Sequence, residues 1–344
     1  LGAAEAFIRG YWTCDNLVEL VRIFCRNAAV SAGMEGGPVR LLSPVARLGH
    51  WLRRNTTAGS RRNIAAHYDL GNEFFALFLD QTLAYSCAIF SRPDSTLHEA
   101  SVAKFDRICR KLALKPEDHL LEIGTGWGGF ALHAASNYRC RITTTTISQK
   151  QYDYTRRLVA SAGLGDRVTV LLKDYRDLTG TYDKLVSIEM IEAVGHQFFG
   201  TYFRACSKLL KRDGLMLVQA ITIPDQRYDA YRRGVDFIQR YIFPGGCLPS
   251  VGAICDSVGR ATDMRLVHFE DLTPHYAETL ALWRQRFVAN HDGVRALGFS
   301  DEFMRTWEYY FCYCEGAFRE RAIGSAQLLL AKPACRREPI LPPL

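Results

Sequence analysis

A glycine-rich segment in the middle of the chain has the spacing of a cofactor-binding turn. The apolar run 120–123 leads directly into Gly124-Thr125-Gly126-Trp127-Gly128-Gly129, which opens a helical pattern. Glycine lets the backbone approach a bound molecule closely, and ligands of open α/β sheets lie at the carboxyl ends of the strands. The segment therefore predicts a nucleotide-like cofactor at this turn, with a plain tight turn as the structural alternative.

The next predicted strand bears on the identity of this cofactor. Gly124, Gly126 and Gly129 satisfy the G-x-G-x-x-G spacing of dinucleotide-binding proteins, so spacing alone does not exclude NAD. However, the strand at 140–146 ends in Thr144-Thr145-Thr146, where a dinucleotide site would carry an acidic residue for the ribose. This difference favours S-adenosylmethionine.

Strand and helix patterns alternate from residue 118 onward and place the glycine turn in a fold. Strands are predicted at 118–123, 140–146, 167–172, 182–188, 215–221, 264–270 and 326–331, and helices at 128–136, 148–162, 197–210, 275–290 and 300–315. This alternation predicts an α/β fold, a parallel sheet covered by helices on both faces. We expect an irregular, aromatic-rich insertion at 224–262 and a loose, proline-containing tail at 333–344.

The first 62 residues are predicted to form a helical segment, 1–50, and a basic linker, 51–62. They contain nine arginines and four acidic residues, a net charge of +5 out of +7 for the whole chain. The pairs Arg53-Arg54 and Arg61-Arg62 flank a polar stretch. We expect this region to rest on anionic lipid headgroups, with a solvated linker as the alternative. The stripe of Phe74, Phe75 and Phe78 is more typical of a core than of a site.

Composition excludes several classes of protein. The chain has 344 residues, of which 48% are hydrophobic and 23% charged, which is ordinary for a globular protein. No apolar run approaches the ~18–20 residues of a membrane-spanning helix. The eleven cysteines lack metal-ligand spacing, so we expect no metal site and reduced thiols in a cytoplasmic protein. Because the sequence begins at Leu1 and not at a methionine, the alternative that a leader segment was removed stays open.

Several motifs together resemble the cyclopropane-fatty-acyl-phospholipid synthase family, which includes mycolic acid cyclopropane synthases and fatty-acid C-methyltransferases. The segments that carry this resemblance are 67–72 with 85–87, the glycine turn, 189–195, 241–249 and 316–319. The resemblance implies a class I S-adenosylmethionine-dependent methyltransferase fold, Rossmann-like, with a catalytic domain at 63–332. It also implies the residues of the cofactor site: Tyr85, Ser86, Gly124, Gly126, Trp127, Gly128, Thr146, Gln151, Tyr175 and Arg176.

The resemblance further implies an active-site bicarbonate ion. The catalytic residues that it assigns are Cys87, Glu192, Gln219, Ile221 and Tyr276. At Gln219 the chain departs from the family, which has histidine there; glutamine can donate a hydrogen bond to an anion but cannot carry a proton. This departure puts the bicarbonate geometry in doubt. Two alternatives stay open: Cys87 as a small buried side chain, and Glu189, three residues before Glu192, as its competitor.

The expected function is cyclopropanation of unsaturated acyl chains in membrane phospholipids. A methylene derived from S-adenosylmethionine would reach a cis double bond through a carbocation, with bicarbonate as base and with Tyr241, Phe243 and Tyr276 as candidates to stabilise the cation. The alternative is a C-methyltransferase that makes methylene- or methyl-branched chains. We expect a phospholipid bilayer as partner, peripheral attachment to the inner face of the membrane and no nucleic acid; a homodimer stays open.

Overall fold

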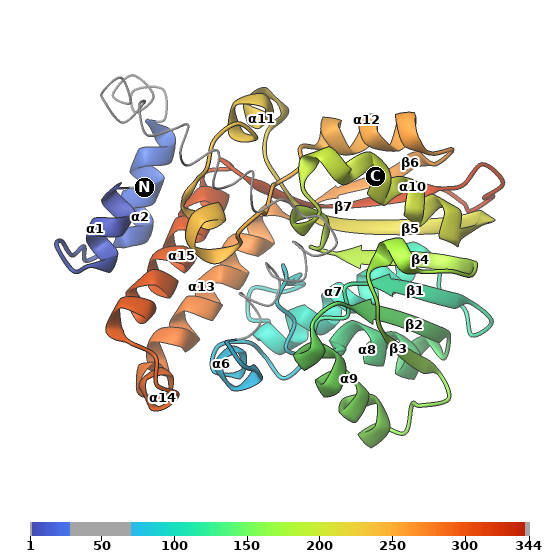
Figure 1. Cartoon of the computed structure of the whole chain (residues 1–344), viewed down its shortest axis with the longest axis horizontal. Helices are drawn as coiled ribbons and strands as arrows, with labels where there is room; N and C mark the ends of the chain where they lie inside the picture. Colours follow the sequence, from blue (N-terminus) through green and yellow to red (C-terminus); the bar gives the residue numbers. More distant parts are fainter. Residues whose placement is uncertain (1, 28–69, 341–344) are drawn as a thin grey trace.

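The computed structural model describes residues 2–27 and 70–340. Its centre is a seven-stranded sheet with the order β3-β2-β1-β4-β5-β7-β6 (Figure 1). The strands are β1 (His119–Ile123), β2 (Arg141–Thr146), β3 (Val168–Leu172), β4 (Tyr182–Ile188), β5 (Leu210–Thr222), β6 (Arg265–Asp271) and β7 (Gly324–Ala331). The predicted α/β fold is confirmed, and the predicted strands match within a few residues, except that β5 begins five residues earlier.

One strand runs against the predicted direction. β7 is antiparallel to both β5 and β6, whereas the sequence suggested a fully parallel sheet. Its first residue, Gly324, pairs with Thr222 at the end of β5, and Ala326 pairs with Asp271 at the end of β6. The helices between β6 and β7 therefore return the chain to the same edge of the sheet, where β5 and β6 end. β7 starts from that edge and must run antiparallel to both strands.

Helices cover both faces of the sheet. α7 (Leu97–Leu112), α8 (Gly129–Tyr138) and α9 (Gln149–Ser161) share one buried cluster with alternate strand residues such as Leu120. α10 (Phe199–Leu209) and α12 (Val251–Ala261) share a second cluster with the intervening residues, such as Leu121. Strand side chains alternate between faces, so adjacent residues belong to different clusters. The sequence predicted an irregular insertion up to residue 262, whereas its last part forms the helix α12.

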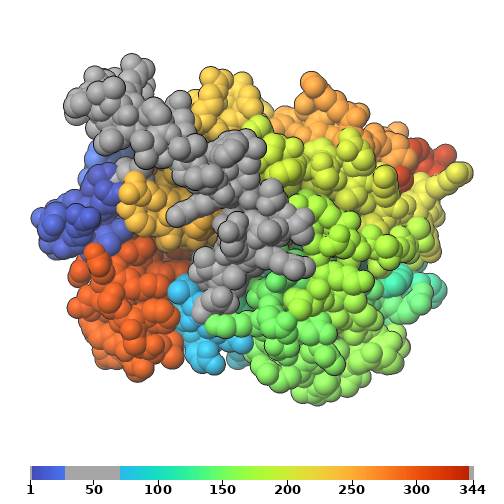
Figure 2. Space-filling model, viewed as in Figure 1, coloured from blue at the N-terminus to red at the C-terminus, as the bar shows by residue number. Residues whose placement is uncertain are grey.

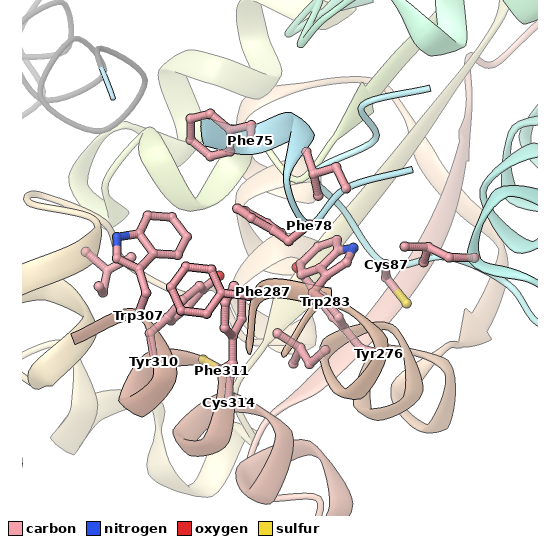
Figure 3. Packing of buried hydrophobic residues seen from close by; sticks show 14 of the residues in the cluster. Phe75, Phe78, Cys87, Tyr276, Trp283, Phe287, Trp307, Tyr310, Phe311 and Cys314 are labelled. Carbon is pink, nitrogen blue, oxygen red and sulfur yellow. The ribbon is translucent and has the colours of Figure 1, made fainter. Parts of the chain in front are cut away.

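A third cluster is built mainly from aromatic side chains. It joins α6 (Asn72–Ala76) to α13 (Thr273–Ala289), α14 (His291–Ala296) and α15 (Asp301–Arg319), and α13 and α15 lie side by side at one end of the sheet (Figure 1). Phe74, Phe75 and Phe78 are completely buried there. Figure 3 shows the Phe78 ring between Phe75 and the aromatic rings of α13 and α15. The interpretation of this stripe as core is confirmed.

The N-terminal helices α1 (Gly2–Ile8) and α2 (Leu17–Arg26) pack against α15. Figure 2 shows them forming one continuous surface with the C-terminal helices. A Cβ on Gly316 would lie 2.7 Å from Val21 Cγ1, so the glycine permits this close packing. Arg22 and Arg26 both bind Glu320, at 2.6 and 2.8 Å, and are therefore engaged within the protein. The basic linker 51–62 lies outside the described residues.

The insertion and the tail are more ordered than expected. Besides α12, the insertion contains α11 (Asp225–Tyr231) and a π-helical turn at Ile238–Ile242. The tail is irregular up to residue 340, but Ala334 N–H donates to Arg212 O and Arg337 donates to Arg110 O. No helix in the described parts of the chain is long and apolar enough to cross a membrane.

Gly128, which precedes α8, offers a test of the cofactor turn. Its φ of +86° favours glycine, and a Cβ there would lie 2.7 Å from Thr155 Cγ2. We expect Gly128→Ala to lower the free energy of unfolding by about 2–4 kcal/mol through left-handed strain plus crowding. Gly163→Ala is the control, because its φ is +66° with no atom within 4 Å. Urea denaturation should show the larger loss for Gly128→Ala; equal losses would refute the crowding.

Candidate active site

A cleft opens at the carboxyl ends of β1, β2 and β4, beside the glycine turn. Gly124 and Gly126 have φ values of +100° and +53°, and the N–H groups of residues 124 and 125 both donate to Thr145 O at 3.0 Å. The turn is thus bonded to the neighbouring strand while its glycines face the cleft. Eight of the ten predicted cofactor residues line the cleft: Tyr85, Ser86, Gly124, Gly126, Trp127, Thr146, Gln151 and Tyr175.

The other two predicted cofactor residues support the cleft from behind. Gly128 packs against α9 through Thr155, as described above. Arg176 forms an ion pair with Asp174 at 2.7 Å, and it is Asp174 that lines the cleft. The pair predicted for the ribose is already joined, because Thr146 Oγ1 donates to Gln151 Oε1 at 2.8 Å.

Glu122 and Lys104 are among the charged residues of the cleft that were missed from the sequence. Glu122 lies in β1 and accepts a hydrogen bond from Thr144 Oγ1 at 2.6 Å, and burial raises its pKa to about 8. Lys104 in α7 donates to Ser86 Oγ at 2.7 Å, and burial lowers its pKa to about 8. An acidic residue inside an otherwise apolar strand was the signal for Glu122. Lys104 had no comparable signal in its mixed helix.

The predicted catalytic residues gather around Glu189, which follows β4. Its Oε1 accepts hydrogen bonds from the Cys87 backbone N–H and from Gln219 Nε2, both at 2.9 Å. Its Oε2 accepts from the Tyr276 hydroxyl at 2.7 Å. The glutamate that meets Cys87 and Tyr276 is therefore Glu189, the competitor left open above, and a catalytic role for Glu192 stays a prediction.

Glu192 lies on the 3₁₀ turn Ile191–Ala193 and has a different environment. Its Oε1 accepts the Ile221 N–H at 2.5 Å, while Oε2 is buried without a hydrogen-bond partner in the described structure. Burial and the neighbouring Glu189 raise the pKa of Glu192 to about 8. Its carbonyl accepts the Cys247 N–H at 2.8 Å, which ties the motif 241–249 to this turn.

A buried chain of hydrogen bonds fixes the direction of the Gln219 amide. Lys111 Nζ donates to Gln327 Oε1 at 2.8 Å, and Gln327 Nε2 donates to Gln219 Oε1 at 2.9 Å. Because an ammonium group can only donate, each amide must accept from the lysine side and donate away from it. Gln219 Nε2 is therefore directed at Glu189. At the far end, Lys111 also forms an ion pair with Glu270.

The Cys87 thiol takes no part in this group of contacts. It donates to Ala88 O at 3.3 Å, and burial followed by the charge of Glu189 raises its pKa well above the ordinary value. The side chain therefore behaves as the small buried group of the open alternative, and only its backbone N–H reaches Glu189.

A bicarbonate ion held as predicted does not fit these residues. The three donors expected to bind it, from Cys87, Gln219 and Tyr276, are all directed at the Glu189 carboxylate. A second anion at the same donors would lie against a buried negative charge with no donor of its own. We therefore derive no catalytic step through bicarbonate.

The aromatic candidates divide between the site and the surface. Tyr276 is buried, with its ring 4.4 Å from the Phe318 ring, and the partly buried Phe243 lies 6.3 Å from Tyr85. Tyr241, in contrast, is 39% exposed and its hydroxyl donates to Glu5 at 2.7 Å. Tyr241 therefore contacts the N-terminal helix α1 at the surface, and its role beside a cation stays a prediction.

The strand order, the antiparallel β7 and the glycine turn define an S-adenosylmethionine-dependent methyltransferase. The solved structure of the cyclopropane synthase MmaA2 from Mycobacterium tuberculosis has a TM-score of 0.74 at 32% identity, covering 79% of this chain and 98% of that one. That of mycolic acid cyclopropane synthase CmaA1 with SAH and CTAB has a TM-score of 0.75 at 35% identity, with the same coverage.

The family follows from the sequence comparisons. The family model described as mycolic acid cyclopropane synthetase matches residues 55–328, and the chain belongs to this family. Tuberculostearic acid methyltransferase UfaA1 of Mycobacterium tuberculosis is 42% identical over 96% of this chain and 79% of its own length. Cyclopropane-fatty-acyl-phospholipid synthase of Escherichia coli is 36% identical over 96% and 83%. The chain is therefore a transferase of one-carbon groups that modifies lipids with S-adenosylmethionine.

The pKa of Glu192 predicts a pH-dependent stability difference. Between its ordinary pKa of 4.5 and its folded pKa of about 8, the folded protein retains a proton that the unfolded chain loses. This contribution therefore lowers wild-type stability as pH rises through that window. Glu192→Gln cannot ionise, so its melting temperature relative to wild type should rise between pH 5 and pH 8.

The control for this effect is Glu117→Gln, which changes an exposed carboxyl group. Scanning calorimetry of the three proteins at several pH values measures the difference. A constant offset between Glu192→Gln and wild type at all pH values would contradict the buried, proton-retaining carboxyl group.

Proposed function

We propose that the chain transfers a one-carbon unit from S-adenosylmethionine to the double bond of an unsaturated acyl chain in a membrane phospholipid. The observation that carries this proposal is a partly buried carboxylate, Glu189, that lines the cofactor cleft. An alkene needs no base to activate it, but the cation that forms after methyl transfer must lose a proton. A proton acceptor beside the cofactor site suits this reaction.

The cofactor supplies an electrophilic methyl group, and the protein supplies position and a dry site. The residues of the cleft fit such a cofactor, since Gly124 and Gly126 leave space at the turn and the polar side chains of Asp174 and Glu122 line the cleft. Holding the alkene in line with the methyl group turns a two-molecule encounter into a local step. Tyr85 lines the cleft and packs against the third cluster, and an aromatic ring beside a developing cation stabilises it by about 0.5–2 kcal/mol.

Two products follow from the same cation. Loss of a proton from the transferred methyl group with ring closure gives a cyclopropane. A hydride shift to the cation followed by proton loss from the new methyl group gives a methylene branch. We favour the branch, because the relative at 42% identity is named as a methyltransferase; the cyclopropane is the second candidate, supported by the synthase at 36%. Reduction of the methylene to a methyl branch needs a hydride donor that this transfer does not supply.

Product analysis tests the proposed function. Vesicles of phosphatidylglycerol with monounsaturated chains, incubated with the full chain and S-adenosylmethionine, should gain the mass of one CH2 group per modified acyl chain. Proton NMR separates a methylene branch, which keeps alkene protons, from a cyclopropane, which does not. Gly124→Val, which adds a branched side chain at a φ of +100°, should abolish the gain. Unchanged acyl masses with wild-type protein would refute the proposal.

We also propose that the chain reaches its substrate as a peripheral protein on anionic lipid. A basic residue near such a surface contributes about 1 kcal/mol, and salt screens this attraction. Reversal of the pair Arg53-Arg54, or of Arg61-Arg62, to glutamate should weaken binding to anionic vesicles about tenfold or more. The exposed pair Arg156-Arg157 on α9 is the matched control. Cosedimentation that is insensitive to salt, or equally reduced by all three reversals, would contradict a localised patch.

A further inference from the structure

Glu189 occupies the position where the family resemblance expected a free anion. Its carboxylate receives donors from three segments that are far apart in sequence, namely the loop before α7, β5 and α13. We infer that Glu189 is the general base of the one-carbon transfer and replaces bicarbonate in this chain. This inference rests on the proposed function and names the residue that accepts the proton.

The four acceptor positions of the carboxylate are unequally used. Oε1 accepts two hydrogen bonds, from Cys87 N–H and Gln219 Nε2, whereas Oε2 accepts one, from Tyr276. Since a carboxylate offers about two lone-pair positions per oxygen, Oε2 keeps one available. The geometry assigns proton acceptance to Oε2, with Gln219 and Tyr276 as positioning residues.

The surroundings hold Glu189 as an acceptor yet make it a stronger base than an exposed carboxylate. Burial raises its pKa, while the hydrogen bonds from Tyr276, Gln219 and Cys87 and the charge of Lys104 oppose the rise. The hydrogen-bond chain from Lys111 leaves the Gln219 amide as a donor, which Glu189 Oε1 accepts at 2.9 Å and Cys87 O at 3.3 Å. A base of intermediate strength is what proton removal near neutral pH requires.

The backbone at Glu189 adds an independent observation. Its φ is +50°, in the left-handed region that favours glycine, and its N–H donates to Gln219 O at 2.8 Å. Strained backbone of this kind persists only where the surrounding structure compensates for it, and it is concentrated at functional sites. A glutamate at such a position is therefore better explained by a role for its side chain than by local folding.

The proton step balances without a further reactant. A C–H bond of the transferred methyl group breaks, and its electron pair forms the new carbon–carbon bond of the ring or the methylene. The proton goes to Glu189 Oε2, which becomes a neutral acid. Because Glu189 lines the cofactor cleft, the proton can then pass to solvent through that opening after the products leave.

Two substitutions at Glu189 separate a base from a structural group. Glu189→Gln keeps the shape of the side chain but removes the base. The glutamine still occupies the space between the three donors. Glu189→Gly suits the φ of +50° and leaves the three donors facing an empty space. With vesicle substrate in carbonate-free buffer, we expect both variants to lose turnover by about 100-fold or more. Added bicarbonate or formate should restore turnover to Glu189→Gly alone, and wild type should not respond.

Calorimetric titrations provide readouts that do not depend on turnover. S-adenosylmethionine should bind to both variants and to wild type with similar affinity. Bicarbonate should bind to Glu189→Gly but not to wild type or Glu189→Gln. The inference is overturned if wild type binds or requires bicarbonate, if Glu189→Gln keeps turnover within tenfold, or if Glu189→Gly is not rescued by either anion. Failure of the proposed function itself would appear differently, as wild-type protein that modifies no unsaturated lipid.

Discussion

The structure depends on holding the partly buried carboxylate of Glu189 beside a cofactor cleft. An unpaired negative charge in a protein interior is strongly unfavourable, so Glu189 requires donors that are already in place before the substrate arrives. Those donors come from Cys87 N–H, from Gln219 on β5 and from Tyr276 on α13. The antiparallel return of β7 serves the same end, because Gln327 on that strand orients the Gln219 amide.

The helices outside the sheet exclude water from this site and hold its side chains in position. α13 supplies Tyr276 and packs along α15, and the rings of Phe74 on α6 and of Phe78 after it contact aromatic rings of both helices. The N-terminal helices then support α15 through the close approach at Gly316 and the ion pairs to Glu320. The first 27 residues therefore stabilise the wall of the active site, in addition to leading into the basic segment.

Local patterns in the sequence predicted most of the fold and the cofactor side of the site. Periodicity located the strands, and the glycine turn located the cleft, because both are properties of neighbouring residues. The choice between Glu189 and Glu192 was beyond such patterns, since it depends on one left-handed residue after β4. The direction of the Gln219 amide depends on Gln327, more than a hundred residues later. The antiparallel β7 likewise follows from how α13 and α15 pack.

A base that is part of the chain, as we infer for Glu189, changes how the product of the reaction is determined. A free anion can adjust its position between donors and can be lost from the site. A glutamate that is fixed by backbone strain, by two donors on one oxygen and by Tyr276 on the other has one location relative to the cofactor. Since the ring and the branch differ in the state of the cation when the proton leaves, this fixed position makes product choice a property of the chain itself. The replacement of histidine by Gln219 fits the same logic, because a neutral amide donor stabilises the carboxylate without offering a competing proton.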